Sequence, residues 1–85
     1  MTIMYVVLEE DSEAELKWVK DRIYSSVNNA LKYFEKYNNS NTKINIVDCG
    51  YDEYFSRDRG LLKKITIQNY LRRIRTFYIK EVVVE

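Results

Sequence analysis

The residues best suited to acid–base or metal chemistry are a few carboxylates near the middle of the chain. Asp48, Asp52 and Glu53 with Lys63 match the residue types of a metal-dependent nuclease, in which carboxylates bind Mg²⁺ and a lysine accompanies them. The sequence has no histidine, the usual general base and a frequent metal ligand. Its two glycines are too few for a glycine-rich phosphate loop. We therefore expect no enzyme activity, no metal site and no cofactor.

Basic residues gather in the C-terminal half, where they are suited to contact phosphates or acidic protein groups. They are Arg57, Arg59, Lys63, Lys64, Arg72, Arg73 and Arg75. Aromatic rings that could stack on bases lie among them: Tyr51, Tyr54, Phe55 and Tyr70. Cations interleaved with aromatic rings are typical of surfaces that bind single-stranded RNA. The alternative is that the arginines are a solvated surface without a partner.

Trp18 is the single tryptophan, and Arg22 follows it four residues later. On a helix these two side chains would share one face, and that face would be exposed. An exposed tryptophan beside an arginine is a plausible contact patch for another protein. The alternative is that a neighbouring loop or the sheet buries Trp18.

The distribution of charge is uneven although the net charge is only +1. Acidic residues dominate positions 1–21, whereas basic residues dominate positions 57–80. This asymmetry indicates an electrostatic partner or pairing between copies of the chain. The alternative is that the two halves neutralise each other within the fold.

The expected location is the cytoplasm. Cys49 is the single cysteine, so no intrachain disulfide can form, as is usual in a reducing compartment. The apolar run near residue 3 is too short for a secretory signal, and acidic residues follow it. No run approaches the roughly 20 apolar residues that cross a bilayer, so we expect no membrane partner.

These side chains are positioned by strands that the sequence marks clearly. Residues 3–8 are apolar at every position, which predicts a strand over 2–8 that is covered on both faces. Residues 43–49 alternate and follow the turn cluster 38–42. Residues 61–65 form a possible short strand, and alternation with β-branched residues predicts a strand from Phe77. Residues 50–60 have no periodicity and predict a long loop.

Two helices are expected between these strands. Ser12 and Glu15 form a capping-box pattern, and apolar residues at spacings of three and four then predict a helix over about 13–37. The alternative breaks this region at 24–26, with a strand before the break and a shorter helix after it. A second helix is expected from Thr66. Its buried stripe would be Ile67, Tyr70, Leu71 and Ile74. Arg72, Arg73 and Arg75 would lie on its solvent side.

The expected order is therefore strand, helix, strand, strand, helix, strand in one domain of 85 residues. This order is that of an α+β, ferredoxin-like fold with two helices on one face of an antiparallel sheet. The alternatives are a three-stranded sheet without the 61–65 strand, or a β-β-α-β order if the first helix splits.

The chain as a whole resembles the small accessory proteins of large tailed phages. The resemblance rests on the opening MTIMYVVLEE, on a composition rich in Asn, Tyr and Lys, and on the absence of His and Pro. It implies a viral protein of the host cytoplasm that inhibits or modulates a host or defence protein, including ribonuclease toxins. The leading hypothesis is thus a non-enzymatic protein-binding inhibitor. The alternative is an RNA-binding protein that uses Arg72, Arg73, Arg75 and the 50–60 loop.

Overall fold

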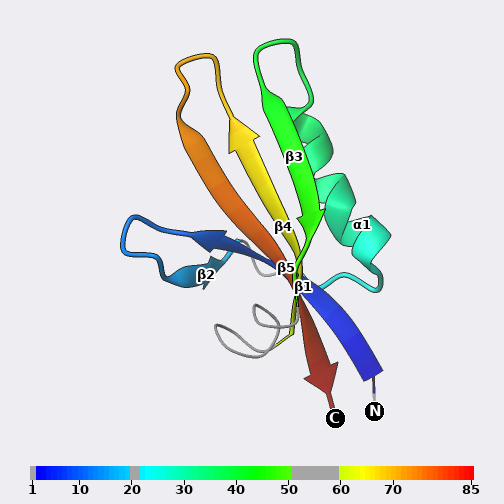
Figure 1. Cartoon of the computed structure of the whole chain (residues 1–85). Coiled ribbons are helices and arrows are strands. Elements are labelled where there is room, and N and C mark those ends of the chain that lie inside the picture. Colours follow the sequence, from blue (N-terminus) through cyan, green and yellow to red (C-terminus); the bar gives the residue numbers. More distant parts are fainter. Residues whose placement is uncertain (1, 20–21, 51–59) are drawn as a thin grey trace.

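The structure is a computed structural model that describes residues 2–19, 22–50 and 60–85. These residues form one five-stranded antiparallel sheet and a single helical segment (Figure 1). The strands are β1 (Thr2–Glu10), β2 (Leu16–Trp18), β3 (Lys43–Asp48), β4 (Leu61–Gln68) and β5 (Ile74–Val84). Their order across the sheet is β2-β1-β5-β4-β3. The helical segment comprises α1 (Val27–Leu31) and a 3-10 helix, η1 (Lys32–Tyr37).

The central strand is β5, which pairs with β1 on one side and with β4 on the other. Phe77 and Ile79 point to one face of the sheet and Tyr78 points to the opposite face, because side chains alternate along a strand. All three are buried. A central strand with two apolar faces requires a core on each side of the sheet.

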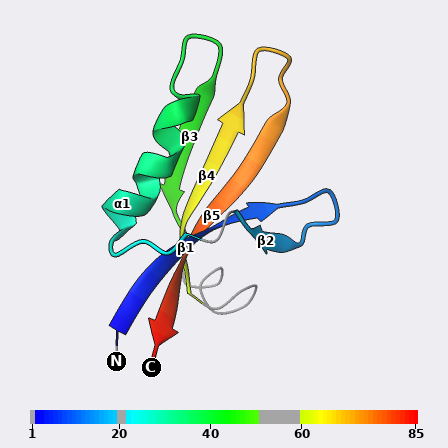
Figure 2. The same ribbon diagram turned by 180° about the vertical axis from the view of Figure 1, so that it is seen from behind.

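The helical segment covers one face of the sheet, which we call the helix face. It lies along β3 in both views of the molecule (Figures 1 and 2). Ala30 and Phe34 from the segment join a core with apolar side chains of three strands: Val7, Ile65, Ile67, Phe77 and Ile79. The opposite face, which we call the second face, has a smaller core of Val6, Leu8, Leu61 and Tyr78.

The strand predictions at 2–8, 43–49 and 61–65 and from Phe77 are confirmed, and so is the antiparallel sheet. Three strands are longer than expected: β1 continues to Glu10, β4 continues to Gln68 and β5 begins at Ile74. The ferredoxin-like arrangement is wrong: the described chain has one helical segment of 11 residues, not two helices on one face. Among the described residues no helix is long and apolar enough to cross a bilayer.

The expected helix over 13–37 is wrong in its first half. Leu16 packs against the core of the second face, whereas Val19 packs against the core of the helix face. A helical stripe would place both residues on one side, so the periodicity was coincidental. The helix begins only after Ser26, whose hydroxyl accepts a hydrogen bond from the Asn29 amide at 3.1 Å. The alternative break at 24–26 therefore describes this region correctly.

The expected helix from Thr66 is wrong throughout. Thr66 pairs with Thr76 and Ile67 pairs with Arg75, so this segment belongs to the β4–β5 hairpin. Tyr70, Leu71 and Ile74 are not buried with Ile67 but are exposed. The spacing of these residues resembles that of a helix only because Ile67 lies near the end of β4, Tyr70 and Leu71 follow in the turn, and Ile74 begins β5.

The β1–β2 and β4–β5 hairpins have turns of the same construction. In the first turn the Asp11 Oδ1 atom accepts hydrogen bonds from the amides of Glu13 and Glu15, at 2.8 and 3.0 Å. Asn69 Oδ1 accepts the corresponding bonds from Leu71 and Arg73, at 2.9 and 3.0 Å. Asp and Asn favour such turns because their short side chains reach the backbone two residues on. The predicted capping box is thus wrong, because Asp11 rather than Ser12 organises this turn.

Replacing Leu71 with Ala should leave the free energy of unfolding within about 0.5 kcal/mol of the wild type, because an exposed turn residue loses little burial. Replacing Ile67 with Ala should cost about 2–5 kcal/mol, because it removes a buried side chain. Urea denaturation followed by circular dichroism measures both. Comparable losses in the two variants would show that residues 66–74 bury one continuous stripe.

Acid should weaken the first turn through Asp11. Hydrogen bonds from the Glu15 amide and from Lys17 lower the pKa of this carboxyl below its ordinary value of 3.8. A lowered pKa adds stability above the unfolded value, and that stability is lost as the pH falls through the folded value. Asp11→Asn keeps an acceptor, as Asn69 does in the other turn, but does not titrate. The two proteins should therefore differ in unfolding free energy at pH 7 and converge below the pKa of Asp11. A constant difference over urea titrations from pH 7 to pH 2 would contradict this role.

Candidate functional site

The most exposed apolar side chains of the described chain lie at the end of the β4–β5 hairpin. Tyr70 is 74% exposed, Ile74 62% and Leu71 57%. Arg72 and Arg73 lie between them and are also exposed. We call these five residues, 70–74, the tip surface. These residues are consecutive in the chain, and the β4–β5 connection that carries them lies at one end of the sheet (Figure 1).

The backbone of the tip surface is held in one conformation. The Arg72 amide donates to the Asn69 carbonyl at 2.9 Å, and the Asn69 amide donates to the Arg73 carbonyl at 3.0 Å. Arg72 has a φ of 63°, a left-handed conformation that usually favours glycine. Neither Arg72 nor Arg73 has a carboxylate partner within the described part of the chain. The tip surface therefore presents two uncompensated cations.

Two hollows flank the hairpin end. The first, of about 300 Å³, opens between the hairpin and the loop before β3. Its lining residues are Ser40, Asn41, Thr42, Lys43, Gln68, Asn69, Tyr70 and Arg72. The second, of about 380 Å³, lies toward the helical segment and is mostly apolar. Its lining residues are Tyr37, Thr42, Ile67, Asn69, Arg73 and Arg75. No described acidic residue lines either hollow, so both favour anionic groups.

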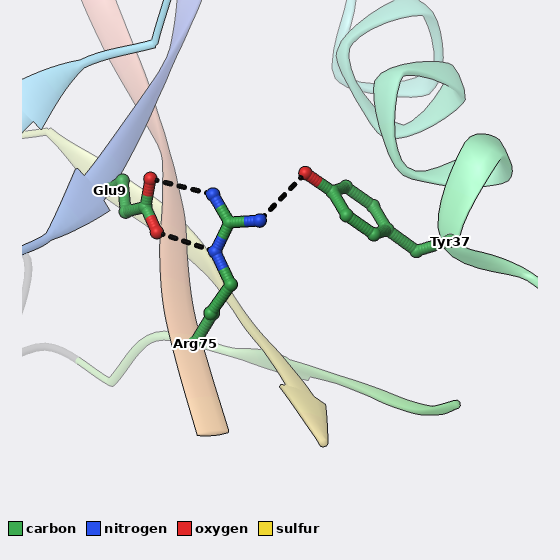
Figure 3. Close-up of polar contacts among 3 residues, drawn as sticks. All are labelled: Glu9, Tyr37 and Arg75. Atoms are coloured by element: carbon green, nitrogen blue, oxygen red, sulfur yellow. Dashed lines mark hydrogen bonds and ion pairs between the residues drawn. The ribbon is translucent and has the colours of Figure 1, made fainter. Parts of the chain in front are cut away.

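Arg75 belongs to a different environment from its two neighbours (Figure 3). Its Nε and Nη2 atoms donate to the two oxygens of Glu9 at 2.8 and 3.0 Å. Its Nη1 atom donates to the Tyr37 hydroxyl at 3.2 Å. The bonds to Glu9 are the main cause of a raised pKa for Arg75. Arg75 is thus a neutralised link between β1, β5 and the helical segment, and its predicted place on a helix with Arg72 and Arg73 is wrong.

The remaining predicted basic and aromatic residues do not join the tip surface. Lys63 forms an ion pair with Asp48 on the helix face. Lys64 lies opposite Tyr78 on the second face. The other predicted residues lie outside the described residues: Tyr51, Tyr54, Phe55, Arg57 and Arg59. Of the cations proposed from the sequence, the structure brings together Arg72 and Arg73, and it adds Lys43 nearby.

Trp18 and Arg22 are not on a helix. Trp18 lies on β2 opposite Leu8 and is 54% exposed. Arg22 is exposed on the segment after β2. Trp18 is on β2, which β1 separates from the β4–β5 hairpin, and Arg22 follows β2 in the chain, so neither residue belongs to the tip surface. Trp18 remains a separate exposed aromatic side chain.

The carboxylates that suggested metal binding offer no such site in the described residues, where no group of three potential ligands occurs. Asp52 and Glu53 lie outside the described residues. Asp48 is engaged by Lys63.

Sequence reasoning missed Leu71 and Ile74 as surface residues because it assigned them to a buried stripe. The signal available was the alternation of Ile65 and Ile67 with Thr66 and Gln68, followed by Asn69. An Asn after alternating β-branched residues is typical of a strand that enters a turn.

Comparison with known proteins gives no match to a protein family, to a curated protein or to a solved structure.

Replacing Arg72 with Gly should stabilise the fold by about 0.5–1 kcal/mol, because glycine adopts a positive φ without strain. Ala14 is the matched control, since it has the same φ of 63° at the same place in the β1–β2 turn. Ala14→Gly should stabilise by a similar amount without removing a charge. Urea denaturation of both variants is the measurement. A loss of stability in Arg72→Gly alone would show that the Arg72 side chain supports the fold instead of facing a partner.

Proposed function

We propose that this protein is a non-enzymatic binding protein that attaches through its tip surface to an acidic, partly apolar surface of another protein. The observation that carries the proposal is the joint exposure of Tyr70, Leu71 and Ile74 around two uncompensated arginines. Tyrosine and arginine are enriched among the residues that dominate the binding energy of protein interfaces. Exposed apolar patches with a polar rim are typical of interaction sites.

The fixed backbone of the turn supports this proposal. Four hydrogen bonds within residues 69–73 set its conformation before any partner arrives. A preorganised loop loses less conformational entropy on binding than a flexible one. The left-handed Arg72 also costs folding energy that a glycine would avoid. A useful arginine side chain at this position would offset that cost.

A binding protein of this size acts by occupying a surface of its partner. We therefore propose that it inhibits or modulates that partner in the cytoplasm, as expected for a phage accessory protein. Arg72 and Arg73 would attract an acidic partner and accelerate association, because complementary charge mainly raises the association rate. Tyr70, Leu71 and Ile74 would supply the apolar contact that slows dissociation.

RNA binding is the second candidate, and Tyr70 is the observation that favours it. Its exposed ring, next to two arginines without a carboxylate partner among the described residues, is suited to stack on a base while the guanidinium groups meet phosphates. The neutralised Arg75 and Lys63 argue against a longer phosphate track in the described residues. We therefore rank RNA below protein as a partner.

The double variant Arg72→Glu, Arg73→Glu should remain folded and lose its protein partner, because it reverses both exposed cations of the tip surface. Co-purification from the native host, with and without nuclease treatment, measures the loss. A partner that survives nuclease with the wild type, in stoichiometric amount, and disappears with the variant supports the proposal. Recovery that depends on RNA supports the second candidate. An unchanged partner would show that the arginines are a solvated surface.

The matched control is Arg22→Glu, Lys32→Glu, which makes the same change of charge at two exposed positions outside the tip surface and the two hollows. Partner recovery should be unaffected by this control, because the site and not the net charge is decisive. Equal losses in the two double variants would indicate attraction by overall charge alone.

A further inference from the structure

The second hollow, between the hairpin and the helical segment, has both apolar and positively charged side chains in its lining. Of these residues only Arg73 belongs to the tip surface. The lining combines the apolar side chain of Ile67 and the ring of Tyr37 with the charged groups of Arg73 and Arg75. We propose that this hollow binds an acidic side chain of the partner protein, with the carboxylate at Arg73 and the adjoining apolar group on Ile67. The inference deepens the proposed function and rests on it.

The charge of the hollow favours an anion with a single charge. Arg75 is compensated by Glu9 through two hydrogen bonds, so it adds little net charge. Arg73 has no carboxylate partner among the described residues. One uncompensated cation matches one singly charged group, whereas the nearby Glu9 would repel a phosphate dianion more strongly. A nucleic-acid phosphodiester is also singly charged, and it is the apolar lining with Ile67 and Tyr37 that favours an aspartate or glutamate beside an apolar group.

Tyr37 offers the second donor. Its hydroxyl oxygen accepts a hydrogen bond from Arg75 Nη1 at 3.2 Å, which leaves the hydroxyl hydrogen able to donate. Hydrogen bonds to a charged acceptor are about twice as strong as neutral ones. The hydroxyl of Tyr37 and the guanidinium of Arg73 would thus hold the carboxylate from two sides of the hollow.

The hollow is continuous with the tip surface because Arg73 belongs to both. A protein that covers Tyr70 and Leu71 would also cover the opening of the hollow. An acidic side chain at that place on the partner would be desolvated at the interface, where an ion pair gains strength. The apolar contact and the ion pair would then fix the orientation of the partner.

The blocked peptides acetyl-Phe-Glu-Leu-amide and acetyl-Phe-Gln-Leu-amide are suitable probes, followed by NMR at the Ile67 methyl groups and the Tyr37 ring. The Glu peptide should bind at millimolar concentration and the Gln peptide about tenfold more weakly, since one charge-assisted contact is absent. Tyr37→Phe should weaken the Glu peptide alone. Equal affinity of the two peptides, or no shift at Ile67 and Tyr37 with either, would overturn the inference.

Arg72 provides a matched control, because it is adjacent to Arg73 and equally charged but lines the other hollow. Arg73→Gln should reduce the affinity for the Glu peptide about tenfold, and Arg72→Gln should leave it nearly unchanged. Equal effects would contradict a site at the hollow. Inorganic phosphate that competes with the Glu peptide at equal concentration would contradict the preference for a carboxylate. Loss of the partner with Tyr70→Ala would still uphold the proposed function in either case.

Discussion

The contact of three aromatic rings with Phe77 is the interaction on which the rest of the structure depends. Phe77 lies at the middle of the sheet with no exposed surface, and Phe34, Tyr37 and Tyr33 surround it with ring centroids 5.2, 6.1 and 6.4 Å away. Such pairs add about 0.5–1.5 kcal/mol each beyond the burial of their area. The contact joins the helical segment to the sheet and brings Tyr37 close to Arg75. The guanidinium of Arg75 in turn lies 5.0 Å from the ring of Phe77. The shape of the hollow beside the tip surface follows from this packing.

Much of the sheet could be predicted from the sequence because strand residues alternate or are apolar throughout, and both patterns depend on local composition. The helices were predicted less well: the favoured helix over 13–37 is correct only in its second half and the helix from Thr66 is wrong, because the same apolar spacing arises when a strand, a turn and another strand follow one another. Leu16 and Val19 show this on opposite faces of the sheet. Ile67 and Leu71 show it as well, because Ile67 is buried in β4 whereas Leu71 is exposed in the turn that follows. Pairing with a distant strand decides between the readings, and a single sequence does not display that pairing.

The candidate site could be predicted only in its charge. Arg72 and Arg73 stand out in the sequence, and the structure leaves both without a carboxylate partner among the described residues. Arg75 could not be separated from them, because its partner Glu9 is 66 residues away in sequence. The alternative, that acidic residues of the first part of the chain neutralise basic residues of the second part, therefore applies to Arg75 and Glu9. Among the described residues it does not apply to Arg72 and Arg73. The apolar members of that surface were hidden by the helical interpretation, and this correction turns a charged helix end into a mixed apolar and basic interface.

A photo-reactive phenylalanine derivative at position 70 tests the central claim most directly, because it replaces the most exposed ring of the tip surface by another ring. Position 12 is the matched control, since Ser12 occupies the same place in the turn of the other hairpin. Irradiation in the native host should join position 70 to one protein, and position 12 should join to none. A cross-link to RNA, the same products from both positions, or none from position 70 would contradict the account.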